Sequence, residues 1–254
     1  YFQIIPFKRK LWWKSMKIYA KYILKRDADA LVVQTDDVKE RVKKLLSKTS
    51  VYTVSNTISE HYLSPKKVVK KLPTKAKKQF RLLTLSAWYP HKNLSIIPKV
   101  LDVLIKKGYT NIVFVVTLSK EDMAKLCPID KYEGQLFNIG PVKVEEGASL
   151  YQECDAMFLP TLLECFSASY AEAMKLHKPI ITSDMGFAHT VCKDAAIYIN
   201  PMDENDIAAK IVELSISNEL QENLVNKGSK RLQMFGTSQD RTRRYIQICQ
   251  SLVK

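Results

Sequence analysis

A regular alternation of unbroken apolar runs and helical segments fills the sequence from residue 81 onward. The runs include RLLTLS at 81–86, NIVFVVT at 111–117, AMFLP at 156–160 and PIITS at 179–183. Between them lie stretches with helical character, such as 94–108 and 167–177. Strands that are apolar on both faces are typical of a parallel sheet covered by helices on both sides. The sequence therefore predicts an α/β fold with a Rossmann-like parallel sheet.

The first 80 residues differ in composition and in organisation. They hold 20 Lys and Arg against 6 Asp and Glu, whereas residues 81–254 hold 20 of each. A helix is expected at 7–26, and a strand–helix–strand follows with Thr35 as the helix N-cap. The stretch 66–80 is basic and contains a proline, which indicates a linker. We therefore predict an N-terminal segment at 1–65, a linker at 66–80 and a domain at 81–254.

Several classes of protein are excluded or disfavoured by composition. No apolar run reaches the roughly 18 residues of a transmembrane helix. The five cysteines are scattered and form no C-x-x-C pair, which argues against a disulfide framework or a zinc site and suits a reducing cytoplasm. The basic excess favours anionic partners such as phosphorylated ligands, nucleic acid or an acidic membrane surface. Because the chain starts without Met, we expect that it begins inside a longer protein or after processing.

Two loops carry the residues that bear chemistry. In parallel sheets, ligands bind beyond the carboxyl ends of the strands. The loop after 81–86 carries His91 and Lys92, and the loop after 156–160 leads through small residues into a helix. A helix N-terminus offers free N–H groups to an anion, and Lys92 on the neighbouring loop adds a positive charge. The pattern predicts a phosphate site.

Two glutamates flank the same turn. Glu164 lies before the helix and Glu172 about one turn inside it, so both are expected to face one cleft. Carboxylates repel phosphate but accept hydrogen bonds from hydroxyls, and a nucleotide sugar offers both groups. Taken singly, each residue has an ordinary explanation: a chance pair of glutamates, a solvated Lys92, or a His91 that caps the next helix. The hypothesis depends on their combination.

The segment from Arg81 to Lys254 resembles the donor-binding half of a GT-B fold retaining glycosyltransferase of the family 4 type, glycosyl transferases group 1. The resemblance is carried by TLSAWYPHKNL, by NIG and by SLYQECDAMFLPTLLECFSASYAEAMKLHKPIITSDMGFAHTVCKDAAIYINPMD. Its signature is the Glu164 and Glu172 spacing, Phe166, and a Pro-led strand ending in Ser183 and Asp184. The YPHKN and FAH versions resemble members that build bacterial surface polysaccharides. Residues 28–60 resemble the last strand–helix–strand of the family's N-terminal acceptor domain.

The resemblance implies roles for the site residues. Lys92 would neutralise the donor pyrophosphate, Glu172 would accept from the ribose hydroxyls, and Glu164 would be the catalytic residue near the reacting carbon. No cofactor or metal is implied, and the donor is expected to be a UDP-sugar first and a GDP-sugar second. The remaining donor-binding residues would be His91, Ser86, Gly140, Phe166, Ser167, Ala168 and Ser169.

The sequence also departs from the family pattern. Ala87 stands where an Arg beside the phosphate is common, Cys165 and Ser167 replace glycines, and Thr190 replaces a Glu. Most of the acceptor domain is missing. The resemblance therefore implies that this chain binds donor only, and that the longer protein transfers the sugar.

The expected partners are a nucleotide sugar, a glycan or lipid-linked acceptor, and an anionic membrane surface contacted through residues 8–26; nucleic acid is not expected. With these partners, we expect the protein to lie in the cytoplasm and at the inner face of the membrane. For the N-terminal helix, packing against the rest of the acceptor domain is the alternative. Two other functions stay open: a sugar-nucleotide epimerase and a non-catalytic nucleotide or nucleic-acid binding module. Against these, no acid–base pair is marked, and no G-x-x-x-x-G-K or G-x-G-x-x-G motif is present.

Overall fold

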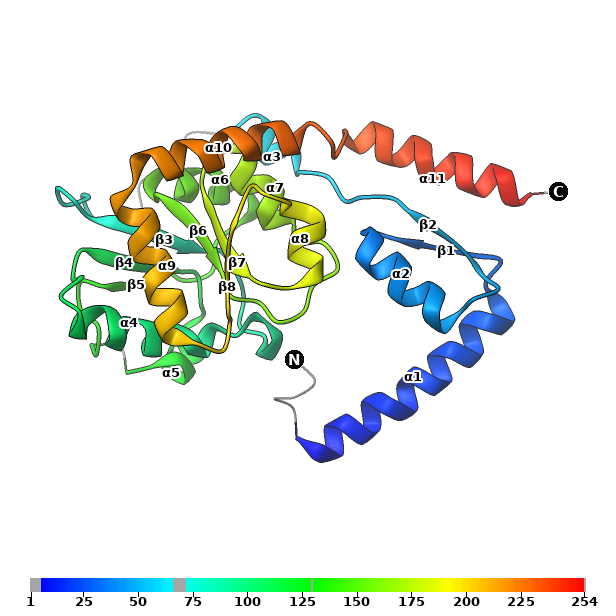
Figure 1. Ribbon diagram of the computed structural model, residues 1–254, viewed down its shortest axis with the longest axis horizontal. Coiled ribbons are helices and arrows are strands. Elements are labelled where there is room, and N and C mark those ends of the chain that lie inside the picture. Colours follow the sequence, from blue (N-terminus) through cyan, green and yellow to red (C-terminus); the bar gives the residue numbers. More distant parts are fainter. Residues whose placement is uncertain (1–5, 66–71, 129, 254) are drawn as a thin grey trace.

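A computed structural model describes residues 6–65, 72–128 and 130–253. They form a large unit on a six-stranded sheet and a small unit on a two-stranded sheet (Figure 1). Every strand pairing is parallel, and helices cover both faces of the large sheet. The predicted α/β fold with a parallel sheet is confirmed.

The large sheet fixes where a ligand can approach. Its strand order is β5-β4-β3-β6-β7-β8. The sheet continues from β3 through β4 and β5 on one side, and from β6 through β7 and β8 on the other. The loops after these two strands therefore diverge, which opens a crevice at the carboxyl edge between them. All residues of β3, β4, β6 and β7 are buried. The strands are β3 (Phe80–Thr84), β4 (Ile112–Val116), β5 (Leu136–Asn138), β6 (Ala156–Leu159), β7 (Ile180–Ser183) and β8 (Ile197–Ile199).

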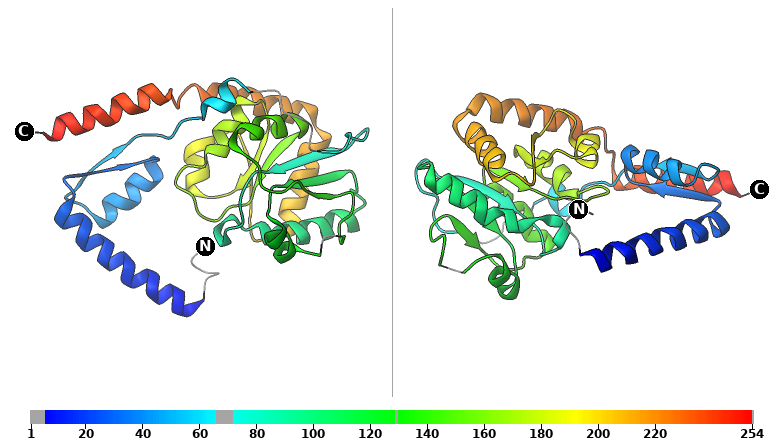
Figure 2. Two further views of the ribbon diagram at one scale, coloured as in Figure 1. Left: turned by 180° about the vertical axis from the view of Figure 1, so that it is seen from behind. Right: turned by 60° about the horizontal axis from the view of Figure 1, so that its bottom comes forward.

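Helices lie on both sides of this sheet (Figure 2), and a hydrophobic core lies on each of its faces. Successive strand residues point to opposite faces, so Leu82 joins one core and Leu83 the other. The first core is covered by α4 (Ile97–Lys106), α5 (Lys120–Leu126) and α9 (Glu204–Ile216). The second is covered by α3 (Glu60–Leu63), α6 (Val144–Glu153), α7 (Ala168–Lys175) and α8 (Gly186–Cys192). α10 (Asn218–Leu232) reaches both cores, and two 3-10 turns, η1 (Pro90–Lys92) and η2 (Leu94–Ile96), follow β3.

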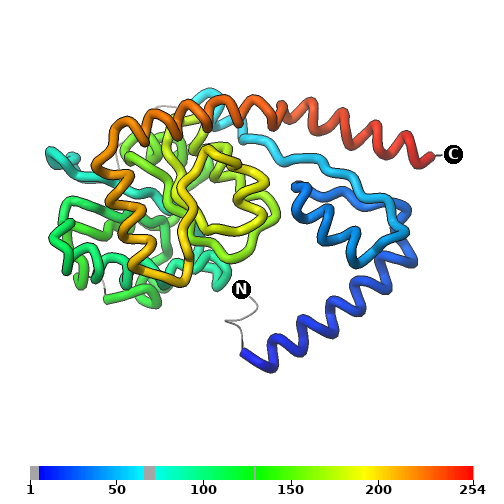
Figure 3. The backbone as a smooth tube through the Cα atoms, viewed as in Figure 1, coloured from blue at the N-terminus to red at the C-terminus, as the bar shows by residue number. Residues whose placement is uncertain are grey.

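The small unit is a single strand–helix–strand with a long helix before it. Its elements are α1 (Phe7–Asp27), β1 (Ala30–Val33), α2 (Asp36–Leu45) and β2 (Ser50–Thr53). The Thr35 hydroxyl accepts a hydrogen bond from the Val38 N–H at 3.4 Å, which confirms the predicted N-cap. No residue of α1 is buried, and the helix runs diagonally from the start of β1 back toward the N-terminus (Figures 1 and 3).

The chain passes between the units twice. Residues 54–59 run from β2 to the large unit, and residues 233–237 lead back from α10 to α11 (Ser238–Leu252), which lies beside the small unit (Figure 3). Arg241 Nη1 donates to Asn56 Oδ1 at 2.9 Å and so joins the two crossings. The units also meet at α2 and α8, where a side chain on Gly186 would lie 2.7 Å from Asp37 Oδ1.

Two short helices, α3 and α8, were absent from the sequence prediction. α8 spans only seven residues, starts at Gly186 and has no side-chain cap, so no start signal marks it. α3 spans four residues inside the segment assigned to the N-terminal part. Its Tyr62 packs in the second core of the large unit. The predicted domain limits stay a prediction, and residues 66–71 of the predicted linker lie outside the described residues.

Candidate functional site

Hydrogen bonds join the loop after β3 to the loop after β6. The backbone carbonyl of His91 accepts from the Leu162 N–H at 2.7 Å and from the Thr161 hydroxyl at 3.0 Å. Asn93 adopts a left-handed conformation with φ 55°, and its side-chain amide donates to the Pro201 carbonyl at 2.7 Å. The two loops that the sequence singled out are therefore one connected structure at the carboxyl edge of the sheet.

Lys92 and Glu164 form an ion pair across these loops. Lys92 Nζ lies 2.5 Å from Glu164 Oε1, and the two side chains are only 17% and 14% exposed. The Thr161 hydroxyl lies 3.2 Å from the same carboxylate oxygen. A charge-assisted contact of this length in a partly buried place holds both side chains in defined positions. The site thus presents a cation directly beside a carboxylate, at the point where the strand order reverses.

Glu172 has a different environment from Glu164. It is the fifth residue of α7 and is buried, with 9% of its surface exposed. Burial raises its pKa to about 7, and a hydrogen bond from the Tyr62 hydroxyl opposes that rise. The sequence placed both glutamates on one cleft. In the structure, Lys92 on the β3 loop pairs with Glu164, whereas Glu172 is buried within α7.

The turn before α7 contains three small residues, of which Ser167 is buried. Ser167 occupies the N-cap position, but its hydroxyl makes no capping hydrogen bond to the helix. Ala168 and Ser169 follow, both partly exposed. Phe166 packs its ring edge-to-face against Phe235, with 5.4 Å between ring centroids. Phe166 therefore anchors the turn to the segment that leads to α11.

Phe166 also lines a pocket between the two units. The pocket has a volume of about 240 Å³. The small unit contributes Thr35 and Asp36 to its wall, and the large unit contributes Thr190 and Arg231. Arg231 donates from Nε to the Val191 carbonyl at 2.7 Å and from Nη2 to the Thr190 carbonyl at 2.9 Å, so it satisfies the end of α8.

The other predicted residues lie along the same edge of the sheet. The Ser86 N–H donates to Thr117 Oγ1 at 3.2 Å, between the ends of β3 and β4. Gly140 follows β5 with φ +74°, a conformation that favours glycine, and its N–H donates to Asn138 Oδ1 at 3.2 Å. The His91 ring stacks on Tyr89, and burial together with the Lys92 charge lowers its pKa.

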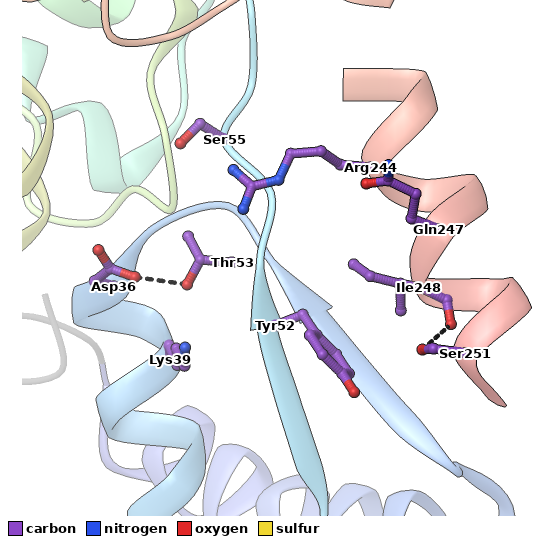
Figure 4. A pocket seen from close by; sticks show the side chains of 9 residues that line it. All are labelled: Asp36, Lys39, Tyr52, Thr53, Ser55, Arg244, Gln247, Ile248 and Ser251. Atoms are coloured by element: carbon purple, nitrogen blue, oxygen red, sulfur yellow. Dashed lines mark hydrogen bonds between the residues drawn. The ribbon is translucent and has the colours of Figure 1, made fainter. Parts of the chain in front are cut away.

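A second, larger pocket lies at the small unit and contains none of the predicted donor-site residues. It has a volume of about 570 Å³ and is bounded by α2, β2 and α11 (Figure 4). The Arg244 side chain extends from α11 toward β2, and Asp36 accepts from the Thr53 hydroxyl at 2.6 Å. Asp36, Thr53 and Ser55 line both this pocket and the smaller one, so the two are neighbours.

Two residues of the site were missed by sequence reasoning. Thr161 hydrogen-bonds to the loop after β3, and Tyr62, from a distant part of the chain, packs against Tyr151 and lowers the pKa of Glu172. A threonine after a strand carries no distinguishing pattern. Tyr62 lies just before the predicted linker, where the sequence predicts no helix, so its packing depends on tertiary structure alone.

Comparison with protein families matches residues 66–231 to the model described as glycosyl transferases group 1. This chain belongs to that family. A curated relative is the O-antigen chain mannosyltransferase RfbU of Salmonella typhimurium, which is 28% identical over 199 residues. That match covers 74% of this chain but only 52% of the relative, so the chain spans about half the length of that protein.

Solved structures with the same fold are GT-B glycosyltransferases. TarM of S. aureus, in complex with fondaparinux, alpha-GlcNAc-glycerol and UDP, matches with a TM-score of 0.73 at 17% identity and covers 90% of this chain and 45% of its own. Sucrose-phosphate synthase from Thermosynechococcus elongatus matches with a TM-score of 0.77 at 15% identity, over 94% and 62% of the two chains. The pneumococcal O-GlcNAc transferase GtfA, in complex with UDP and GlcNAc, has a TM-score of 0.69 at 15% identity, over 91% and 47%.

The family match disfavours the epimerase and the nucleic-acid binding alternatives. Within the described residues, no helix has both the length and the apolar character needed to cross a bilayer.

Proposed function

We propose that this chain carries the nucleotide-sugar donor site of a retaining glycosyltransferase that builds a bacterial surface polysaccharide. The observation that carries the proposal is the Lys92–Glu164 ion pair at the point where the strand order of the large sheet reverses. Ligands of open parallel sheets bind at that point. Two of the structural neighbours were solved with UDP, which supports a nucleotide as the ligand. We propose a UDP-sugar as the donor and a GDP-sugar as the second candidate.

The proposed role of each site residue follows from its charge and its hydrogen-bonding groups. Lys92 pairs with the donor pyrophosphate, and the N–H groups of Phe166 to Ser169 at the start of α7 donate to its oxygens. When Lys92 turns to the phosphate, Glu164 is released to accept from hydroxyls of the transferred sugar. Glu172 accepts from the ribose hydroxyls, and the backbone around Gly140 borders the base. As the bond from sugar to phosphate breaks, Lys92 and the N–H groups stabilise the charge that develops on the leaving diphosphate.

Isothermal titration calorimetry of the chain with UDP, GDP and ADP tests the donor site. We expect one nucleotide to bind, and Lys92→Met and Glu172→Gln each to weaken it at least about tenfold, since each loses a charge-assisted contact. Lys75→Met is the matched control. Lys75 also makes a 2.5 Å ion pair, with Asp155, but at the opposite edge of the sheet, where Asp155 accepts from the Arg81 N–H.

Two outcomes would contradict the donor site: no binding of any of the three nucleotides, or an equal loss of affinity in Lys75→Met. Retention is a separate question. It is tested with the longer protein by following the anomeric protons of the product by NMR; a product with inverted configuration rejects a retaining mechanism.

We also propose that α1 rests on an anionic membrane surface, which would suit a lipid-linked acceptor. Lys10, Lys14, Lys17 and Lys21 recur at helical spacing, and Trp12 and Trp13 are 52% and 42% exposed. Exposed tryptophans and lysines together favour the interface of an anionic bilayer. Sedimentation with phosphatidylserine vesicles is expected to retain the chain and to release it at high salt. Absence of binding would leave α1 as a helix covered by other parts of the protein.

A further inference from the structure

The pocket bounded by α2, β2 and α11 has the composition of a site for a small polar ligand. Its volume of about 570 Å³ is typical of pockets that hold small molecules. Nine residues line it, and seven of them are polar or charged. The two others are Tyr52 on β2 and Ile248 on α11 (Figure 4). Such a lining suits a ligand that is polar throughout and disfavours a lipid chain.

Two cations line this pocket from different elements. Lys39 belongs to α2 and Arg244 to α11, and the two helices lie on opposite sides of the pocket (Figure 4). Among the residues that the structure describes, neither side chain has a hydrogen bond or an ion pair. Two like charges on one cavity attract an anion between them. Neither cation has to give up an ion pair in order to bind that anion.

On α2, the acid that lies closest to Lys39 in helical spacing is already engaged. Asp36 precedes Lys39 by three residues, a spacing at which side chains on a helix meet. Its Oδ1 instead accepts from the Thr53 hydroxyl on β2 at 2.6 Å. Asp36 is the only carboxylate among the residues that line the pocket, so the lining carries one net positive charge.

The same arrangement occurs on α11. Asp240 precedes Arg244 by four residues, but its Oδ1 lies 3.1 Å from Nη1 of Arg243. Its Oδ2 accepts from the Thr237 N–H at 3.0 Å and from the Thr237 hydroxyl at 2.7 Å, as the cap of the helix. The acid that would neutralise Arg244 within the helix therefore serves other partners, and Arg244 extends toward β2 (Figure 4).

The groups that line the pocket match a phosphate that is attached to hydroxyl-bearing carbons. A guanidinium binds two phosphate oxygens at once, and an ammonium adds a point charge. The Ser55 hydroxyl and the Gln247 amide also line the pocket, and neither is hydrogen-bonded to another of the described residues. They can donate to the remaining phosphate oxygen and to hydroxyls. Asp36 repels phosphate, but its free lone pairs accept from hydroxyls of the same ligand.

We propose that this pocket is a second ligand site, which binds a small phosphate monoester of a sugar or polyol through Lys39 and Arg244. The proposal goes beyond the donor site and does not depend on it, because the pocket contains none of the residues assigned to the donor. A ligand held by both cations contacts α2 and α11 at once. It therefore ties the helix that returns from the large unit to the small unit.

Calorimetric titration of the whole chain tests this site. The probes are glycerol 3-phosphate and glucose 6-phosphate, with glycerol as the uncharged control, all at one ionic strength. Lys39→Gln and Arg244→Gln each remove one charge from the pocket. Lys43→Gln and Arg243→Gln are the matched controls, because they remove a charge from the same two helices but do not line the pocket. Circular dichroism confirms that all four variants are folded.

We expect one molecule of at least one of the two phosphates to bind per chain, and glycerol not to bind. Lys39→Gln and Arg244→Gln should each weaken the binding by about tenfold, since each removes a charge-assisted contact. The matched controls should change it less than about twofold, as expected for charges outside the pocket. If glycerol 3-phosphate binds in this way while UDP and GDP do not bind, the donor site fails and the second site stands.

Three results would overturn the second site. The first is that neither phosphate binds. The second is an equal loss of affinity in the matched controls, which would mean that the phosphates respond only to the overall positive charge. The third is a loss in Lys92→Met with none in Arg244→Gln, which would place the phosphate at the donor site.

Discussion

The large and the small unit contain the same kinds of element but bury them very differently. Every residue of β3, β4, β6 and β7 is buried, and helices close both faces of that sheet. In the small unit, α1 and α2 contain no buried residue, and β1 is half-buried along its whole length. The excess of positive charge also lies in the first 80 residues. Stability is therefore expected to come from the large unit, and exposed charge from the small one.

Two matched aromatic truncations, Phe158→Ala in the large unit and Trp12→Ala in the small unit, test this comparison. The larger effect is expected from Phe158→Ala. Phe158 on β6 is fully buried and packs edge-to-face on Phe114, with centroids 5.3 Å apart. Phe158→Ala should reduce the free energy of unfolding by roughly 3–5 kcal/mol, because it removes apolar contacts and leaves a cavity. Urea denaturation followed by circular dichroism measures the change. A loss below about 1 kcal/mol would show that the large unit is not the cooperative core of the chain.

Burial of the Glu172 carboxylate in the large unit should lower the free energy of unfolding, and this effect should depend on pH. Burial raises its pKa to about 7, against the ordinary value of 4.5 for a glutamate. Between these values the folded state binds more protons than the unfolded state, so this group's contribution to stability falls as pH rises. Glu172→Gln should match the wild type below about pH 4 and be more stable above pH 7, by roughly 3 kcal/mol at about 1.36 kcal/mol per pKa unit.

Urea denaturation of both proteins from pH 5 to 8 measures that difference. A constant gap across the range would contradict the buried, proton-binding carboxylate. The carboxylate is retained at a cost in stability, which is common at functional sites.

Gly147→Ala tests the packing that the large unit offers to the chain returning from the small one. The new Cβ would lie 2.1 Å from the Tyr62 hydroxyl oxygen and 3.0 Å from the ring carbon that bears it. Overpacking of this kind should cost roughly 1–3 kcal/mol of unfolding free energy. In a Tyr62→Phe background the cost should shrink, because the nearest atom is gone. Thermal unfolding of the four proteins closes the cycle, and equal costs in both backgrounds would reject the contact.

The smallest effect belongs to the small unit. Trp12 on α1 is 52% exposed, so Trp12→Ala should change the free energy of unfolding by no more than about 0.5 kcal/mol. The same urea series that follows Phe158→Ala provides the comparison. A loss approaching that of Phe158→Ala would mean that α1 contributes to the core of a folded unit, and the contrast between the two units would fail.

The structural features that could be predicted from the sequence are those that depend on local sequence patterns. The unbroken apolar runs predicted the parallel sheet, and Thr35 followed by acids predicted the start of α2. The loops with Lys92 and Glu164 were found because the carboxyl ends of parallel strands share one edge. Their direct pairing was not foreseen, because two opposite charges on separate loops reveal no distance.

The packing of Tyr62 against Tyr151 and Gly147 could not be predicted in this way. It depends on how α3 docks between α6 and α7, which no periodicity or capping pattern encodes. Gly147 leaves the space that Tyr62 occupies. A glycine inside a helical stretch has many explanations, so it does not predict this packing.

The paired crossings between the units have a mechanical consequence. A single covalent connection would let the units twist and bend freely about one point. Here residues 54–59 and 233–237 run side by side and are joined by Arg241 and Asn56. Two parallel connections resist twisting and sliding, so the easiest relative motion is rotation about one axis through both. Distances between spin labels on the two units should then vary together, as expected for a hinge with one degree of freedom.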